Sequence, residues 1–123
     1  MSQSLPPIEG LLNFSECADR IPWQPFRVGV EIHRIYGDGI NGPAAALLRF
    51  HQRAEVPLHE HTGFEHIIIL SGSQEDCRGT FGAGTLLINL PGSQHRVTSK
   101  DGCVVLVIYE KPVHFLPEPP QGI

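Results

Sequence analysis

Turn-forming residues divide this sequence into short segments, and this division limits the fold more than any other feature. Signals such as Gly37-Asp38-Gly39, Gly82-Ala83-Gly84 and Pro91-Gly92-Ser93 recur about every 8–12 residues. The segments between them are apolar, or they alternate in polarity with the two-residue period of a strand. We therefore expect seven or eight short strands and an all-β sandwich or barrel.

The strands can be placed from the same pattern. Residues 27–36 alternate, with Val28, Val30 and Ile32 on one face, so one strand is expected there. A polar turn is expected over residues 71–76, followed by a short strand or loop through Phe81. The remaining strands are expected at residues 44–51, 56–61, 65–70, 85–89, 95–98 and 103–110.

Two of these segments are apolar on both faces. They are Ile67-Ile68-Ile69 and Val104-Val105-Leu106-Val107-Ile108. An antiparallel sheet with one face in water would alternate there, so both faces should be covered. Because one chain can bury only one face of such a sheet in its own core, the other face should meet a homodimer partner or the N-terminal arm.

The length of 123 residues is that of one domain with a single core. Within it we expect an N-terminal arm over residues 1–25, a barrel over residues 26–111 and a proline-rich, extended tail over residues 112–123. In the arm, a pattern that begins at Asn13 is typical of a short helical turn that ends near Arg20.

The composition argues against several classes of function. The net charge is −4 and no basic run is present, so the chain is not expected to bind nucleic acid. The apolar runs are too short to span a membrane, and the N-terminus lacks the basic and apolar regions of a secretory signal. Cys17, Cys77 and Cys103 lack CxxC spacing, so we expect free thiols and a cytoplasmic protein.

Three histidines and a glutamate form the pattern that indicates chemistry. His59 and His61 are two residues apart, so both imidazoles point to the same face of an extended strand. Glu65 follows a turn at Gly63, and His95 follows another tight turn at the start of a strand. Imidazoles and a carboxylate that converge in an apolar chain suit a divalent transition metal.

We therefore expect one divalent metal per chain, held by His59, His61, Glu65 and His95. These ligands accept Zn, Fe(II), Mn, Ni or Cu, so the pattern leaves the identity of the metal open. Ligands of this kind keep a position for water or substrate, as catalytic sites do, whereas structural zinc sites are usually closed by thiolates. Glu65 is also the candidate catalytic residue, since a carboxylate can move a proton.

The other histidines are interpreted as non-ligands. His66 is adjacent to Glu65, so on a strand it points to the opposite face. His33 and His51 have no partner at ligand spacing, and His114 lies in the proline-rich tail.

Other polar and aromatic residues have structural interpretations. Arg49 and Arg53 are expected at the surface, with the alternative that either binds a substrate carboxylate. Trp23 lies between prolines and is expected to be a lid or interface residue. Glu60 should face solvent. Four further aromatic residues are interpreted as core residues: Tyr36, Phe64, Phe81 and Tyr109.

The metal pattern resembles the motifs of a known superfamily. His59-x-His61-xxx-Glu65-(six residues)-Gly72 is similar to the first cupin motif, and Gly84-(six residues)-Pro91-Gly92-xx-His95 looks like a shortened second motif. Over about residues 47–110, the sequence most resembles the cupin domain of ChrR-type anti-sigma factors. The resemblance implies a double-stranded β-helix, that is, an RmlC-like jelly-roll barrel with a metal inside.

The chain departs from the family pattern at three places. Arg53 stands where the first motif usually begins with glycine, and the second motif ends in Ser99 where many cupins have asparagine. The helical zinc-binding domain that contacts the sigma factor in ChrR has no counterpart in the residues before the first strand. We therefore do not expect this chain to be an anti-sigma factor by itself.

Two classes of function follow from the resemblance. The first is a mononuclear metal-dependent dioxygenase acting on a small organic molecule. The alternative is a non-catalytic sensor or ligand-binding module, since the cupin domain is the sensory part of ChrR. A third hypothesis is a protein whose outer sheet makes an interaction and whose metal is incidental. Access to the metal discriminates among them, because an enzyme needs an open metal position beside a substrate-sized cavity.

Overall fold

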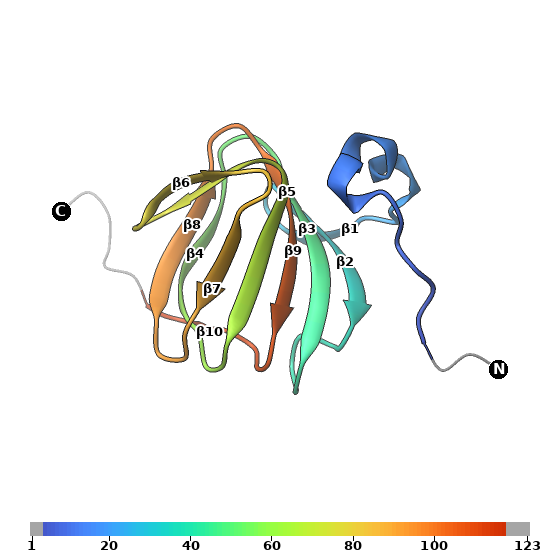
Figure 1. Cartoon of the computed structure of the whole chain (residues 1–123). Helices are drawn as coiled ribbons and strands as arrows, with labels where there is room; N and C mark the ends of the chain where they lie inside the picture. The colour runs from blue at the N-terminus through green and yellow to red at the C-terminus, as the bar shows by residue number, and fades with distance from the viewer. Residues whose placement is uncertain (1–3, 118–123) are drawn as a thin grey trace.

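The computed structural model describes residues 4–117, in which strands dominate and helix is confined to two short 3₁₀ segments near the N-terminus (Figure 1). The elements in chain order are η1 (Leu11–Glu16), η2 (Ala18–Arg20), β1 (Gln24–Arg27), β2 (Val30–Tyr36), β3 (Ala44–Phe50), β4 (Ala54–Glu60), β5 (Glu65–Asp76), β6 (Gly79–Gly82), β7 (Leu86–Asn89), β8 (Gln94–Ser99), β9 (Cys103–Tyr109) and β10 (His114–Phe115).

The strands form two layers that face each other, as the all-β jelly-roll interpretation predicts. One layer contains β1, β2, β3, β9, the first part of β5 and β7. The other contains β4, β8, β10, β6 and the last part of β5. All of these pairings are antiparallel, and the sheet curls so that the two layers enclose the core (Figure 1).

Strand β5 belongs to both layers, and this corrects the turn expected over residues 71–76. The register with β9 shifts between Ile69 and Ser71, and the strand then continues to Asp76 beside β6. Gly72 permits the bend, because a Cβ there would lie 2.0 Å from the backbone oxygen of Gly102. Ser71 and Gly72 thus still pair with β9, residues 73–76 pair with β6 in the second layer, and the turn comes after them.

The strand expected over residues 27–36 is in fact a hairpin. β1 ends at Arg27 and β2 begins at Val30, with Gly29 at a φ of 76° in the turn between them. Val28 lies in this turn and is 97% exposed, although its position in the alternation suggested a buried face. The alternation could not reveal the hairpin because a two-residue turn preserves the period of two.

The space between the layers is filled by apolar side chains. The main buried cluster includes Val30, Phe50, Ile69, Val97 and Val105, which come from both layers. Burial of this kind stabilises the barrel by about 25 cal/mol per Å² of apolar surface removed from water.

The N-terminal arm covers part of the outer face of the first layer. Phe14 and Cys17 of the arm are buried against Leu47 and Val104, which point outward from β3 and β9. Trp23 lies beside Phe14 in this cluster, with ring centroids 6.2 Å apart. Of the two coverings expected for this face, the structure thus shows the arm.

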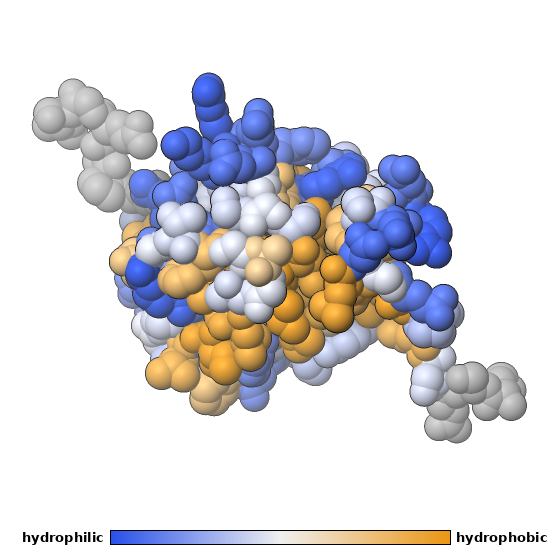
Figure 2. All heavy atoms as spheres, turned by 45° about the horizontal axis from the view of Figure 1, so that its top comes forward, coloured by the Kyte–Doolittle hydropathy of each residue, from blue (hydrophilic) through white to orange (hydrophobic). Residues whose placement is uncertain are grey.

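The rest of the same outer face remains apolar and exposed. Leu86 and Ile88 of β7 and Ile108 of β9 are among its exposed side chains. Apolar side chains gather in a broad area on the side shown in Figure 2.

The chain after β9 returns to the second layer. β10 pairs with the end of β4, so that Phe115 lies opposite His59. The last part of the expected tail, residues 118–123, lies outside the described residues. No helix among the described residues has the length and apolar character needed to cross a membrane. The division into arm, barrel and tail stays a prediction.

Candidate metal centre

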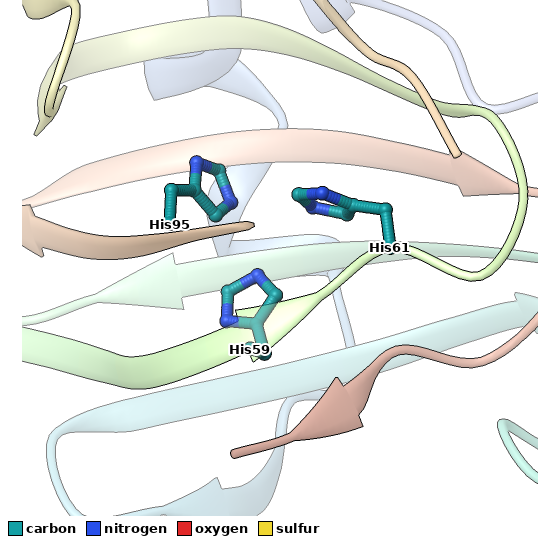
Figure 3. A group of neighbouring side chains, drawn as sticks. All are labelled: His59, His61 and His95. Carbon is teal, nitrogen blue, oxygen red and sulfur yellow. The ribbon is translucent and has the colours of Figure 1, made fainter. Parts of the chain in front are cut away.

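Three histidines converge inside the barrel (Figure 3). His59 lies near the end of β4, His61 follows that strand, and His95 lies opposite His59 on β8. One nitrogen from each ring lies within 4.8 Å of the others, and the residues are only 2–5% exposed. Histidine, cysteine and acidic side chains are the usual metal ligands, and among the described residues these three histidines form the group of such side chains whose geometry could hold a metal.

The rings of His59 and His61 are oriented by hydrogen bonds at Nδ1. His59 Nδ1 donates to the carbonyl oxygen of Pro57 at 2.8 Å, and His61 Nδ1 lies 3.0 Å from the carbonyl oxygen of Ser93. A carbonyl oxygen only accepts, so we assign the imidazole proton to Nδ1 in both residues. Each Nε2 therefore carries the lone pair that a metal needs.

His95 is oriented in the same way by a carboxylate. Its Nδ1 donates to Asp76 Oδ2 at 3.0 Å, and Arg78 holds Asp76 from the other side. Burial raises the pKa of Asp76, but hydrogen bonds from Arg78 and His95 outweigh this and lower the pKa to about 2. Burial lowers the pKa of His95 to about 4, which keeps the imidazole neutral. A carboxylate behind a histidine is a common arrangement around protein-bound metals.

Glu65 lies beside the histidines without joining the group of three. Its Oε1 is 3.1 Å from His61 Nε2 and accepts a hydrogen bond from Asn89 Nδ2 at 3.0 Å. Burial raises the pKa of this carboxyl, but the contacts with His61 and Asn89 outweigh it, so the pKa is lowered. Glu65 is therefore ionised inside the barrel.

Two buried ring nitrogens provide a test of whether a metal fits this site. Nε2 of His61 and Nε2 of His95 are inaccessible to solvent and have no hydrogen-bond partner among the described residues. With the His61 proton on Nδ1, its Nε2 and the Glu65 Oε1 3.1 Å away present lone pairs to each other, so either a proton or a metal ion is needed between the two atoms. Two ligands about 2.1 Å from one metal and at a right angle would lie about 3 Å apart. The donor set thus fits a divalent metal.

A chain of hydrogen bonds connects Glu65 to His95 around the outside of the site. Asn89 donates to Glu65 and accepts from Arg78 Nη2 at 2.9 Å. The same Arg78 nitrogen contacts Asp76, which accepts from His95. Because each group in the chain has a partner at both ends, the two side chains are held in fixed orientations.

A cavity of about 280 Å³ opens beside the histidines. His59, Glu65 and His95 line it. Most of its other walls are apolar and come from both layers, for example Ile32, Phe50, Ile67, Val97, Val105 and Val107. The site therefore combines a metal-capable group with a partly enclosed, mostly apolar space large enough for a small organic molecule.

Four polar residues of this cavity were not predicted. Arg27, Arg34 and Gln74 line it, and so does Tyr109, which was interpreted as a core residue. The strand boundaries expected around Arg27 and Gln74 were wrong, so the sequence pattern did not predict that these side chains face the cavity. Alternation within β2 could have found Arg34, because Ile32 and Arg34 share a face.

The arginines and the tryptophan singled out from the sequence lie elsewhere. Arg49 pairs with Glu31 at 2.8 Å, and its guanidinium lies over the Trp23 ring. Trp23 itself packs against the arm cluster and does not line the cavity, so it is an interface residue and not a lid. Arg53 has a φ of 67° and is the one non-glycine residue with positive φ among the described residues. That conformation explains why glycine usually stands there in the first cupin motif.

The side chains interpreted as non-ligands have other partners or positions. His51 Nε2 lies 2.8 Å from Glu31, and Glu60 accepts a hydrogen bond from Gln94. His66 is half-buried and adjacent to the inward Glu65, as expected for the opposite face of β5.

Comparison with known proteins agrees with this geometry. Residues 15–113 match the family model of the ChrR cupin-like domain. No curated protein matches the sequence.

Solved structures give the same fold. The complex of Rhodobacter sphaeroides SigE with the anti-sigma ChrR matches with a TM-score of 0.65 and 25% identity, covering 73% of this chain and 49% of that chain. This chain thus spans about half of the length of ChrR. An RmlC-like cupin from Ralstonia eutropha has a TM-score of 0.74 and 19% identity over 98% of this chain and 77% of its own. An acetylacetone dioxygenase from Acinetobacter johnsonii has a TM-score of 0.74 and 12% identity, and the match covers 96% of this chain and 80% of that chain.

Proposed function

Since this chain belongs to the ChrR cupin-like domain family, we propose that it is a mononuclear metal-dependent enzyme of the dioxygenase type. In this proposal one divalent transition metal binds to the Nε2 atoms of His59, His61 and His95, with Glu65 as a fourth ligand. The substrate is a small organic molecule that occupies the adjoining cavity.

The observation that carries the proposal is the position of the unpartnered Nε2 atoms beside the cavity. His61 and His95 each have a buried Nε2 without a hydrogen bond, and His95 also lines the cavity of about 280 Å³. A metal bound here would therefore meet a molecule in the cavity. A structural metal site is normally closed by its protein ligands, so the open side favours catalysis.

The chain's own residues have definite roles in such a reaction. A bound transition metal would supply Lewis-acid or oxygen-activating chemistry. The apolar walls exclude water from the bound molecule, which strengthens electrostatic interactions inside the cavity. Glu65 is ionised and lines the cavity, so it is placed to accept a proton from a bound molecule. An acetylacetone dioxygenase shares the fold, which supports this type of chemistry as an analogy.

A sensory function is the second candidate, and it rests on the family match. The ChrR structure was determined in complex with SigE, so a domain of this family occurs in a protein that binds a sigma factor. In this alternative the metal stabilises the fold, and the cavity binds a signal molecule without turning it over.

Metal analysis combined with oxygen uptake separates the two candidates. The protein is purified without a chelating tag, and its metal content is measured by elemental analysis. Oxygen uptake is then followed against a panel of diketones and phenols. We expect stoichiometric iron, nickel or copper and uptake with part of the panel. Tightly bound zinc without uptake would favour the sensor, and the absence of any metal would refute the metal centre.

We also propose that the chain is a cytoplasmic homodimer. The exposed apolar face that includes Leu86, Ile88 and Ile108 supports the dimer, because a patch of this kind is commonly an interface. This face lies on the same layer as the arm cluster, so the two together would form one continuous apolar interface. A monomeric mass in light scattering at micromolar concentration would contradict the dimer.

A further inference from the structure

Two of the cavity residues are arginines that form no ion pair with any described residue. Within residues 4–117, Arg49 pairs with Glu31 and Arg78 pairs with Asp76, whereas no carboxylate oxygen lies within 4.0 Å of Arg27 or Arg34. Arginine has no neutral form at physiological pH, so both side chains bring a positive charge to the cavity.

Aromatic packing holds Arg27 in place instead of a carboxylate. Its guanidinium carbon lies 4.6 Å from the centroid of the Phe115 ring and 5.6 Å from that of Phe26. The Nε atom is buried and has no hydrogen-bond partner within residues 4–117. Phe115 also lies over His59, with ring centroids 5.7 Å apart, so Arg27 is near the metal-capable group. A donor fixed by packing and without an acceptor is suited to a ligand.

Arg34 lies in the exposed part of the lining. Its guanidinium is beside Gly39, as is the hydroxyl of Tyr109. The guanidinium carbon lies 5.9 Å from the Phe26 ring, so Phe26 contacts both arginines. This position suits a charge that attracts an anion toward the cavity.

Gln74 adds a second unpartnered donor in the interior. It is 1% exposed and lines the cavity, and its Nε2 makes no hydrogen bond to any described residue. A buried amide nitrogen normally has an acceptor, so this donor on the cavity wall is available to an oxygen atom of a bound molecule.

The charges of the cavity favour an anion. Glu65 is the one carboxylate among the described lining residues, against the two guanidinium groups of Arg27 and Arg34. A divalent metal would add further positive charge. Arg34 is hydrogen-bonded to the Tyr109 hydroxyl, but a neutral or cationic molecule would leave the buried Nε of Arg27 without an acceptor, whereas an anionic oxygen can accept from it.

We infer that the cavity binds a small organic acid. Arg27 pairs with its carboxylate, Gln74 donates to one of its oxygens, Arg34 guides it from solvent, and its hydrocarbon part lies on the apolar walls. This inference rests on the proposed function only in placing the ligand in the same cavity, since the anion preference comes from the chain's own side chains.

The test compares anions with neutral molecules of the same shape. Benzoate with benzamide and phenylacetate with phenylacetamide are titrated into the full chain by calorimetry, with and without removal of metal by a chelator. We expect each acid to bind at least about tenfold more tightly than its amide in both forms, and the preference to weaken as salt is raised.

Variants then assign the preference to particular residues. Arg27→Gln should reduce acid binding about tenfold and leave amide binding unchanged, and Gln74→Met should weaken binding of both. Arg20→Gln is the matched control, because Arg20 is exposed in the arm. Circular dichroism confirms that each variant folds.

The outcomes are distinguishable from those for the metal centre. Equal binding of acids and amides, no binding of either, or a preference that survives in Arg27→Gln would overturn the inference. A chelator-treated protein that keeps the preference while showing no oxygen uptake with any metal would refute the dioxygenase proposal and leave the acid-binding cavity intact.

Discussion

Replacing Asp76 by asparagine tests whether the histidines are oriented in advance for a metal. Asp76 accepts the Nδ1 hydrogen of His95 at 3.0 Å, and its side chain is 1% exposed between His95 and Arg78. Asparagine keeps the shape but removes the negative charge that holds the proton on His95 Nδ1. The His95 Nε2 lone pair would then be a weaker and less well oriented metal ligand.

The structure shows how the charge of Asp76 is held. A pKa of about 2 for Asp76, against an ordinary value of 3.8, corresponds to about 2.5 kcal/mol of stabilisation of the charged form, and contacts with Arg78 supply more of it than the contact with His95. Loss of a carboxylate behind a metal-binding histidine typically lowers metal affinity about 10–100-fold, or about 1.4–2.7 kcal/mol. We therefore expect Asp76→Asn to weaken metal binding about 10–100-fold.

The assay is competition for Zn²⁺ between the protein and a chromophoric chelator. Thermal unfolding of the metal-free variant is measured alongside, because the loss of the Arg78 contact also affects stability. Glu75→Gln is the matched control, since Glu75 is the adjacent carboxylate on β5 and pairs in register with Thr98 and Thr80. A folded Asp76→Asn variant that binds Zn²⁺ within twofold of the wild type would refute the reasoning.

Three further predictions follow from the same structure. Combined alanine substitution of His59 and His61 should abolish stoichiometric metal binding, measured by elemental analysis, whereas the control His66→Ala should keep it. Metal retained by both variants would refute the site. Burial lowers the pKa of His59 and lowers that of His95 to about 4. The unfolded chain therefore takes up protons first, near pH 6.5, and the stability of the metal-free protein should fall in urea titrations as pH decreases from about 6.5 to 4. It should fall further below pH 4, because the pKa of Asp76 is lowered from 3.8 to about 2 and the unfolded chain again takes up the proton first; a flat profile would contradict both. Arg53→Gly should raise the free energy of unfolding by about 0.5–1 kcal/mol, because it relieves a positive φ in a side-chain-bearing residue; a loss of stability would show that the Arg53 side chain makes a compensating contact.

Local patterns were sufficient for much of the fold. The turn rhythm and the alternation predicted an all-β sandwich or barrel, the resemblance to cupin motifs implied a jelly roll, and β3, β7, β8 and β9 lie within one or two residues of their expected positions. The arm also contains the short helical turns expected before Arg20. These features follow from neighbouring residues, because strand period and turn conformation are local properties of the backbone.

The same local reasoning brought the three histidines together, since spacing and turns determine the face of each strand. It failed where the chain changes direction without changing period. The hairpin at Val28 and Gly29 preserves the alternation, and the bend at Gly72 carries β5 into the second layer through residues that resemble a turn.

Only the tertiary structure placed the groups that surround the histidines. Asp76, Arg78 and Asn89 support the site, but they are distant from it in sequence or lie in segments whose strand boundaries were predicted wrongly. Arg27 and Gln74 face the cavity because the two layers close over it. Donor type and spacing are local, so the sequence by itself was enough to single out the three histidines that the structure brings together. Which charges and donors share the cavity with them depended on long-range strand pairing, since side chains that are far apart in the sequence meet only when the sheet curls closed.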